Sequence, residues 1–466
     1  MEHSGVVYPP VPLTLRAEDE KAVEALADRL VAETLHASEN FASQGHVADP
    51  SCWKVIKEKD SIVAYLDISN ARPLRRDRFW SEDTVVVTAS PQNPTLYPTS
   101  GRSFEAFQGQ GLAALDDDSE EEQSYHHDDF VKLGAKGGFE TSVLEKFRPE
   151  NVPIVFSSGI FPGKVEDMAL GFLADTEART RMRNNTNKEV IVEDTRILAK
   201  IHGPTRDDPF RFLGVKWSSH SPSRTVALVV KPRDYLVIES TGIALDSNGQ
   251  RFCYMLNHSI QMDEVPAFRE LGQVRIFFST CHLMRSCEDG ESVQAYSRGF
   301  LDIGGSFSVR LGAVQLAEGL VAVPKVLEES YLKKLAWMMR DQLGLSTTSS
   351  ASDSNSNSNS NSNSNSNSFS SSGSSKFGTD TSNSCSCCQG KLSSRFGGLM
   401  EKKAVCNLCR QTVCHKCTVR KLLPLESSRG RHMKKKDMEF CLNCYLTAKR
   451  LPAWHVAVAT LSNDSA

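Results

Sequence analysis

Residues 406–417 read CNLCRQTVCHKC, so four of these twelve residues are cysteine. They form two of four C-x-x-C pairs in the last part of the chain. The full set is Cys385/Cys388, Cys406/Cys409, Cys414/Cys417 and Cys441/Cys444. A C-x-x-C turn directs two thiolates at one tetrahedral metal ion, and a second such turn completes the four ligands. Eight paired cysteines therefore predict two zinc ions.

The spacing also predicts how the pairs share the two ions. Only four residues separate Cys409 from Cys414, too few to close a separate domain easily. We therefore expect interleaved sites, with the first zinc held by Cys385, Cys388, Cys414 and Cys417 and the second by Cys406, Cys409, Cys441 and Cys444. So small a core would depend on zinc for most of its folding free energy. Cys387 has no partner at the right offset and is predicted not to be a ligand. The alternative for the whole set, free thiols or disulfides, is disfavoured by the regular pairing.

Length and composition limit the class of protein. The 466 residues predict two or three domains, and 54 Lys and Arg against 57 Asp and Glu leave a formal charge of −3. No segment approaches the ~18 consecutive apolar residues of a membrane span. The start of the chain lacks a signal-peptide pattern. We therefore expect a cytosolic protein, in which thiols stay reduced and dense paired cysteines indicate metal.

The near-neutral total conceals a basic C-terminal segment. Between Cys385 and Arg450 there are 15 Lys and Arg and 4 Asp and Glu, which leaves a net charge of +11. A basic module favours an anionic partner, such as a membrane surface or nucleic acid. We expect the membrane surface, or a protein partner, and no nucleic acid.

A Ser/Asn run separates this segment from the rest of the chain. Residues 354–368 alternate Ser and Asn, and Ser and Gly continue around them from Ser346 to Ser384. With almost nothing apolar to bury, this stretch is predicted to be a flexible, disordered linker. The expected organisation is a tail at 1–16, a large domain at 17–343, the linker at 344–384, a finger at 385–450 and a second tail at 451–466.

The large domain begins with a helical pattern. Six apolar residues recur at helical spacing near its start: Val23, Leu26, Ala27, Leu30, Val31 and Leu35. Residues 52–69 then read as two short strands around a turn at Lys59-Asp60. Residues 71–150 give a weak signal and include an acidic run, so we predict a solvated or disordered insertion there.

Order returns after the insertion. Residues 151–185 predict a strand that leads into a helix, and six strand-like segments follow at 190–203, 210–221, 224–242, 251–262, 273–287 and 291–305. The domain closes with an amphipathic helix at 323–344, for which Gly344 is the expected stop. One helix, many antiparallel strands and a long closing helix predict an α+β fold.

The cysteine segment resembles the FYVE zinc finger, a small cross-brace fold with two zinc ions. The C-x2-C-x4-C-x2-C centre at 406–417 matches that family, as does FGGLMEKKAVC at 396–406. In the family an apolar turret enters the bilayer, and a basic motif binds phosphatidylinositol 3-phosphate. The resemblance therefore implies peripheral binding to endosomal membranes. The implied lipid contacts are the apolar Phe396, Leu399 and Met400 and the basic Lys402 and Lys403.

The chain departs from the basic motif of that family. Ala404 and Val405 replace two histidines, Asn407 replaces an arginine, and the family's W-x-x-D ahead of the first cysteine is missing. The remaining lysines, with RGRHMKKK at 429–436, predict general attraction to anionic lipid. Three alternatives stay open for this segment: a solvated basic loop over a zinc-packed core, a FYVE-related finger that binds a small GTPase, and a RING-type ubiquitin-ligase finger.

The large domain resembles a START-like lipid-binding domain over residues 17–341, apart from the insertion. The resemblance rests on the strand pair with Trp53 and Tyr65, on the segments at 163–182 and 231–242, and on the final helix. It implies a helix-grip fold, in which an antiparallel sheet wraps around a long C-terminal helix and leaves an apolar tunnel for one lipid. Arg233 and Asp234 could line the mouth of a pocket, although a salt bridge or an exposed turn is the more ordinary role.

No nucleophile–base pair or paired-carboxylate motif stands out in the sequence. We therefore expect a non-enzymatic, zinc-containing protein that binds lipid in its large domain and anionic membranes through its finger. The alternative is a protein–protein adaptor whose finger binds a small GTPase or another partner.

Overall fold

The structure, a computed structural model, describes residues 8–69, 89–91, 142–184, 190–222, 231–348, 384–392, 403–426 and 433–461. Most of the predicted insertion and of the predicted Ser/Asn linker lies outside these residues. The chain divides into two compact units, Met1–Ser330 with Ala457–Ala466, and Tyr331–Val456. None of the helices in these ranges combines the length and the apolar character that a transmembrane span requires.

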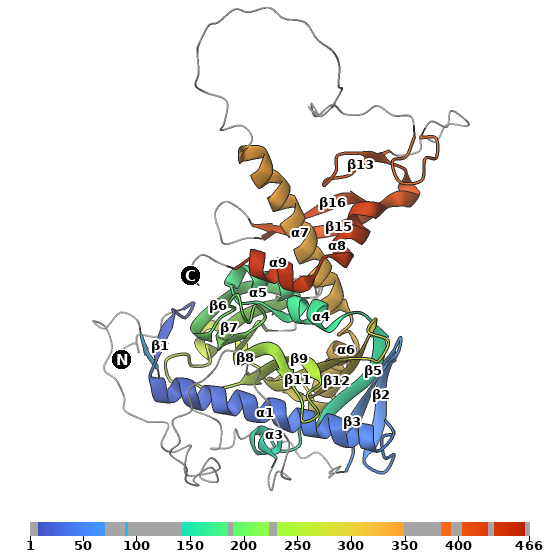
Figure 1. The fold of residues 1–466 in the computed structure, drawn as a ribbon. Coiled ribbons are helices and arrows are strands. Elements are labelled where there is room, and N and C mark those ends of the chain that lie inside the picture. The colour runs from blue at the N-terminus through green and yellow to red at the C-terminus, as the bar shows by residue number, and fades with distance from the viewer. Residues whose placement is uncertain are drawn as a thin grey trace, which may run out of the picture. The chain divides into compact units, whose positions relative to one another are not determined.

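The first unit is built on an antiparallel sheet (Figure 1). Its strands lie side by side in the order β2 (Trp53–Lys59), β3 (Ile62–Asp67), β5 (Val155–Pro162), β12 (Ser292–Asp302), β11 (Phe277–Ser286), β9 (Arg251–Ser259), β8 (Arg233–Leu245), β7 (Phe212–Pro222) and β6 (Val190–His202). A short strand, β10 (Val274–Arg275), pairs parallel with β8. β1 (Leu13–Leu15) pairs with β4 (Ala89–Pro91). Because β12 lies between β5 and β11, the last strand of this sheet in the chain joins the early strands β2, β3 and β5 to the later ones.

Helices cover both faces of the sheet. Figure 1 shows α1 (Ala17–Ser43) along one face and α4 (Val165–Phe172) with α5 (Glu177–Asn184) on the other. The remaining helical elements of this part are α3 (Val143–Phe147), η3 (Arg269–Leu271), α6 (Val309–Val321), which packs against β12, β5, β3 and β2, and the start of α7 (Lys325–Thr348). Strands paired antiparallel and helices packed on them confirm the α+β class.

The predicted elements at the start of the domain are confirmed. All six apolar residues that marked the first helix are buried in α1. The two predicted strands are β2 and β3, and the turn between them contains Asp60, whose φ is 53°. The strand-like segments correspond to β6, β7, β8, β9, β11 and β12.

Two details at the end of the domain differ from the prediction. The stop expected at Gly344 is wrong, because α7 continues to Thr348. A glycine inside a helix costs only about 1 kcal/mol relative to alanine, so one glycine need not end it. α6 was not predicted; Ser308 caps it by accepting a hydrogen bond from the Leu311 N–H at 3.3 Å.

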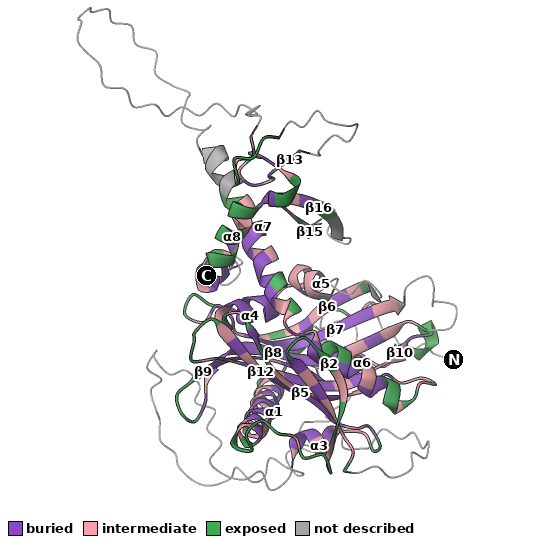
Figure 2. Ribbon diagram, turned by 90° about the vertical axis from the view of Figure 1, so that its right-hand side faces the viewer, coloured by how far each residue is buried: buried purple, intermediate pink, exposed green. Residues whose placement is uncertain are grey.

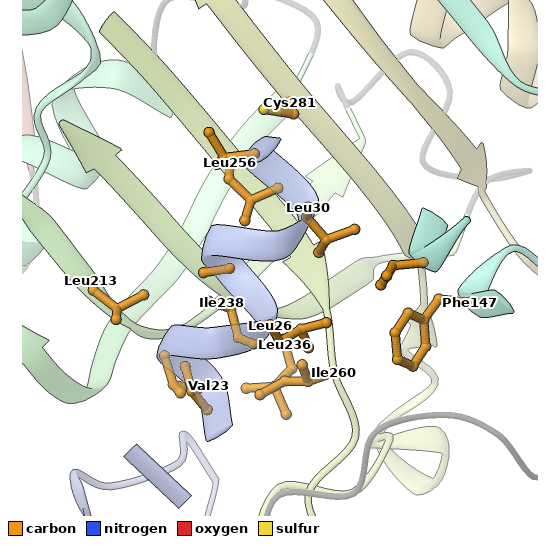
Figure 3. Close-up of a cluster of buried hydrophobic side chains, with 14 of the residues drawn as sticks. Val23, Leu26, Leu30, Phe147, Leu213, Leu236, Ile238, Leu256, Ile260 and Cys281 are labelled. Carbon is orange, nitrogen blue, oxygen red and sulfur yellow. The ribbon is translucent and has the colours of Figure 1, made fainter. Parts of the chain in front are cut away.

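The hydrophobic core lies between α1 and one face of the sheet. Figure 3 shows Val23, Leu26 and Leu30 of α1 directed at side chains of the strands. The partners labelled there are Leu213, Leu236, Ile238, Leu256, Ile260 and Cys281, with Phe147 of α3 at the side. Figure 2 shows the buried residues of α1 and of the central strands in purple. The sheet and α1 therefore form one packed layer pair.

Truncation of Leu30 tests this packing. The side chain is 2% exposed, so Leu30→Ala leaves a cavity that the surrounding strands cannot fully close. We expect the free energy of unfolding to fall by about 2–5 kcal/mol. Urea unfolding followed by circular dichroism measures the change, and Lys21→Ala on the exposed side of α1 is the matched control. A loss below about 0.5 kcal/mol, the range typical of surface substitutions, would contradict the packing.

The second unit joins most of α7 to the cysteine segment. Its strands pair as β13 (Ala404–Val405) with β14 (Thr412–Val413), and as β15 (Thr418–Glu426) with β16 (Met433–Cys441). Its helical elements are η4 (His415–Cys417), α8 (Leu442–Arg450) and the first residues of α9 (Ala453–Ala459). We call the paired β15 and β16 the basic ribbon.

Candidate metal centre

Two groups of four cysteine sulfurs come together in the second unit. Within each group the Sγ atoms all lie within 4.8 Å of one another. The first group is Cys385, Cys388, Cys414 and Cys417, and the second is Cys406, Cys409, Cys441 and Cys444. These are the interleaved sets that the spacing predicts.

The sulfur separations fit a shared metal ion. The Sγ atoms of Cys388 and Cys414 are 3.8 Å apart, and so are those of Cys409 and Cys441. Zinc–sulfur bonds of ~2.3 Å in a tetrahedron place the sulfurs about 3.8 Å apart. A disulfide would bring them to ~2.05 Å, and all eight cysteines are free thiols. Four soft sulfur donors in this arrangement suit zinc or iron.

The first pair of each group is held in the same backbone turn. The equivalent hydrogen bonds are Cys385 N to Gly390 O (2.8 Å) and Gln389 N to Cys385 O (2.8 Å) in one, and Cys406 N to Gln411 O (3.0 Å) and Arg410 N to Cys406 O (3.0 Å) in the other. Gln389 and Arg410 also share the left-handed conformation, with φ values of 58° and 61°. The turns at Cys385 and at Cys406 differ in the residues between their cysteines, yet they hold the two sulfurs with the same backbone geometry.

The second pair of each group comes from a helical turn. Cys414 directly precedes η4 and Cys417 is its last residue, while Cys441 caps the start of α8 and Cys444 lies in its first turn. The Cys444 N–H donates to Cys441 Sγ at 3.3 Å. Backbone N–H groups at a helix start favour negative charge, so they stabilise the thiolates that a metal needs. His415 lies inside η4 and belongs to neither group.

Hydrogen bonds also lower the pKa of two of the thiols. Burial alone would raise the pKa of Cys385, but N–H groups, first that of Cys414, outweigh it and lower the pKa to about 6. The pKa of Cys406 falls to about 4, chiefly because the Cys444 thiol donates to it. Burial raises the pKa of Cys441 to about 12. A metal dication that binds the four sulfurs of a group would displace their remaining protons to solvent.

Of the five predicted lipid contacts, only Lys403 lies among the residues that the structure describes. It is exposed and directly precedes β13. In β13 the side chain of Val405 is 49% exposed. Phe396, Leu399, Met400 and Lys402 lie outside the described residues. One predicted contact, Lys403, is therefore present as an exposed basic side chain, and Val405, which was not among the predicted contacts, is exposed close to it in the sequence.

The basic ribbon is a feature that the sequence analysis missed. The sequence predicts only a cluster of charge at 429–436, whereas residues from Met433 onward are in β16, paired residue by residue with β15. One face of the ribbon is buried through Leu423 and Phe440, at 1% and 0% exposure. On the other, Leu422 is exposed. Residues 419–423 read VRKLL and do not alternate between apolar and polar, so periodicity did not mark this strand.

A buried charge cluster in the first unit holds α5 and the segment before it against the sheet. Lys216 Nζ lies 2.7 Å from Glu239 Oε1 and donates to Ala174 O at 2.5 Å. Arg183 pairs with the same carboxylate and donates to Phe172 O at 2.8 Å. Burial lowers the pKa of Lys216 to about 8, although Glu239 opposes the shift. Because each cation has acceptors within the fold, the cluster acts as an anchor for α4 and α5.

Asp234, a candidate for a pocket mouth from the sequence, has a structural role. It is fully buried and accepts hydrogen bonds from Trp217 Nε1 at 2.9 Å and from Arg275 Nη2 at 2.7 Å. Arg233 beside it is half-buried and donates to the Lys231 carbonyl at 2.8 Å. The salt-bridge role is thus confirmed for Asp234, with Arg275 as its partner.

Comparisons with known proteins find similarity in structure alone. No family model matches the sequence, and no curated protein matches it. One similar solved structure is the crystal structure of human STARD10, with 12% identity over 63% of this chain and 77% of that chain and a TM-score of 0.30. A second is human StAR-related lipid transfer protein 5, with 10% identity over 67% of this chain and 96% of that chain and a TM-score of 0.35. A third is the lipid transfer and protein localization domain of human StarD13 (DLC2), with 9% identity over 64% of this chain and 95% of that chain and a TM-score of 0.30. Values this low assign no function to the chain.

Proposed function

We propose that the chain is a non-enzymatic protein that joins a FYVE-like finger with two structural zinc ions to a START-like lipid-binding domain. The observation that carries the finger proposal is the pair of interleaved sulfur groups, each at the spacing of a tetrahedral site. Bound zinc would neutralise the thiolates and cross-link the elements that bear them. In the first site these are the turn at Cys385 and η4, and in the second the β13–β14 turn and α8.

Metal titration tests the two-ion proposal. Cobalt(II) added to the metal-free full-length chain should give the visible absorption of tetrahedral tetrathiolate sites. The absorption should saturate at two ions per chain and disappear when zinc displaces the cobalt. Saturation at one ion, or the weak absorption of an octahedral site, would contradict the proposal.

For the finger we propose peripheral binding to anionic membranes, including endosomal membranes. The net charge of +11 between Cys385 and Arg450 supports this, together with exposed Lys403 beside Val405, which is 49% exposed. Each basic residue near an anionic surface contributes ~1 kcal/mol, and salt screens that attraction. Flotation with anionic vesicles at low and high salt tests the proposal. Absence of binding at low salt would favour the adaptor function instead.

Phosphoinositide choice gives a further prediction. The chain has Ala404 and Val405 where the FYVE motif has histidines, so several charge-assisted hydrogen bonds of ~1.5–3 kcal/mol each would be missing. Without them the finger should bind 3-, 4- and 5-phosphates of equal charge within about threefold of one another. Matched vesicles measure this, and Lys402→Ala with Lys403→Ala should weaken all three equally. A strong preference for the 3-phosphate would overturn the prediction.

For the large domain we propose the binding of one lipid. The proposal rests on the sequence resemblance to START domains and on the antiparallel sheet with helices on both faces. Native mass spectrometry of the full-length chain, followed by extraction and lipid analysis, tests it. One lipid per chain is the expected result. A chain that carries none and takes up none from mixed vesicles would contradict it.

A further inference from the structure

The helix that precedes the Ser/Asn run packs into the core of the cysteine unit. Leu335 of α7 is 0% exposed and clusters with buried residues of the finger. Its neighbours on the same stripe of α7, which pack against that cluster, are Leu332, Ala336, Met338 and Met339. The finger side of the cluster includes Val413, Leu423, Met438, Phe440 and Ala448. These α7 side chains thus pack against a surface made by the basic ribbon and α8, which Figure 1 shows beside α7.

A buried lysine fixes the same contact through a polar bond. Lys334 is 0% exposed, and its Nζ donates to the Lys449 carbonyl at 3.3 Å. Lys449 lies in the last turn of α8, where backbone carbonyls lack partners within the helix and carry partial negative charge. Lys334 therefore supplies, from α7, a cap for the end of α8. A buried ammonium group without a hydrogen-bond partner is costly, so this hydrogen bond favours the observed position of α7 against α8.

Aromatic contacts extend the packing along α7. The ring of Tyr331 meets the ring of Tyr445 of α8 edge to face, with centroids 6.4 Å apart. Lys449 Nζ lies 4.9 Å from the centre of the Tyr331 ring. Further along, Trp337 meets His455 edge to face at 5.2 Å. Residues from Tyr331 to Met339 thus contact the finger over more than two helical turns.

The elements that receive α7 are held together by the cysteine groups. Cys417 ends η4 directly before β15, and Cys441 ends β16 and caps α8. These cysteines belong to different groups, so both proposed ions lie at the base of the receiving surface. Without metal the small core around Phe440 has too few apolar residues to hold the ribbon and α8 in place.

We infer that the finger bears a helix-docking surface on the basic ribbon and α8, that α7 residues 331–339 occupy it in cis, and that docking and zinc binding stabilise each other. The inference rests on the proposed two zinc ions. Only 35 residues, 349–383, join α7 to the first turn of the finger, so docking is intramolecular and favoured over a separate helix. Coupling is reciprocal at equilibrium: a docked α7 must raise the affinity for zinc by the factor by which zinc favours docking. Because undocking uncovers the finger core, zinc should also be lost more slowly from the docked state.

Hydrogen exchange of the full-length chain tests the coupling. Amide protection is measured by mass spectrometry in peptides that cover residues 331–341, before and after zinc removal by a chelator, with zinc content measured in parallel. We expect exchange in these peptides to accelerate at least tenfold when zinc is removed. Unchanged protection of 331–341 in a chain that has lost both ions would overturn the inference.

Matched variants separate docking from metal ligation. Leu335→Glu removes the central apolar contact without touching a cysteine, and Arg340→Glu introduces the same side chain at an exposed position of α7. Leu335→Glu should retain two ions but lose them to chelator at least tenfold faster, whereas Arg340→Glu should behave as wild type. Lys334→Met, which keeps the buried volume, should accelerate the loss severalfold. Wild-type loss rates in both Leu335→Glu and Lys334→Met would overturn the inference.

The metal content distinguishes this inference from the proposed function. A wild-type chain without bound zinc would overturn both the two-zinc proposal and the coupling. A wild-type chain with two ions whose loss leaves α7 unchanged would overturn the coupling alone.

Discussion

Replacement of Cys406 by serine is expected to eliminate the second metal site and to unfold the cysteine unit. Cys406 is 0% exposed, and its Sγ accepts the Leu408 N–H at 3.4 Å at the centre of the small core. A serine oxygen is a poor zinc ligand, and structural zinc contributes ~10–16 kcal/mol to the folding of such units. Zinc content should fall from two ions to one or none, and hydrogen exchange throughout 403–450 should become rapid.

Cys387→Ser is the matched control for this variant. Cys387 lies in the same segment but belongs to neither sulfur group. Its replacement should leave zinc content and exchange unchanged. Equal losses from both variants would show that zinc is not bound by the eight paired cysteines.

Acidification is expected to destabilise the first unit strongly. Burial lowers the pKa of His220 to about 4, of His258 to about 3 and of His282 to about 4. In the unfolded chain these residues titrate near ~6.5. Below that pH the unfolded state binds more protons than the folded state. The stability is therefore fully present above pH ~6.5 and is lost as pH falls towards 4. Nearly all of the change between pH 7.5 and 5.5 occurs below pH ~6.5, so each histidine removes about 1.4 kcal/mol over this whole interval, or about 4 kcal/mol for the three.

Urea unfolding at pH 7.5 and 5.5 measures this loss. His258→Gln should remove about a third of the pH dependence, because one of the three buried groups no longer titrates. His46→Asn is the control, since His46 is exposed and asparagine tolerates its φ of 59°. A pH dependence unchanged by His258→Gln would show that other groups are responsible.

The elements that the sequence predicted are those whose pattern is local. The apolar residues from Val23 to Leu35 recur at helical spacing, which predicts a helix that packs on one face, and α1 confirms this prediction. The C-x-x-C spacing likewise limits which sulfurs can meet, and the two groups are the sets it indicated. In both cases neighbouring residues carry the whole signal.

The features that were missed depend on contacts between distant residues. The apolar stripe of α7 identifies a helix that must be covered, but nothing in residues 323–344 shows that its cover lies beyond the Ser/Asn run at Phe440. The charge cluster joins Arg183, Lys216 and Glu239 from three separate elements. Lone charges inside the apolar strands β7 and β8 were its only trace in the sequence. Tertiary partners, rather than local preference, decide such positions.

The central claim, that eight cysteines hold two zinc ions, is tested most directly by native mass spectrometry of the full-length chain. The chain should be purified without added chelator and its intact mass compared before and after acid release of metal. The account predicts a mass excess of two zinc ions per chain. One ion, another metal or none would contradict it.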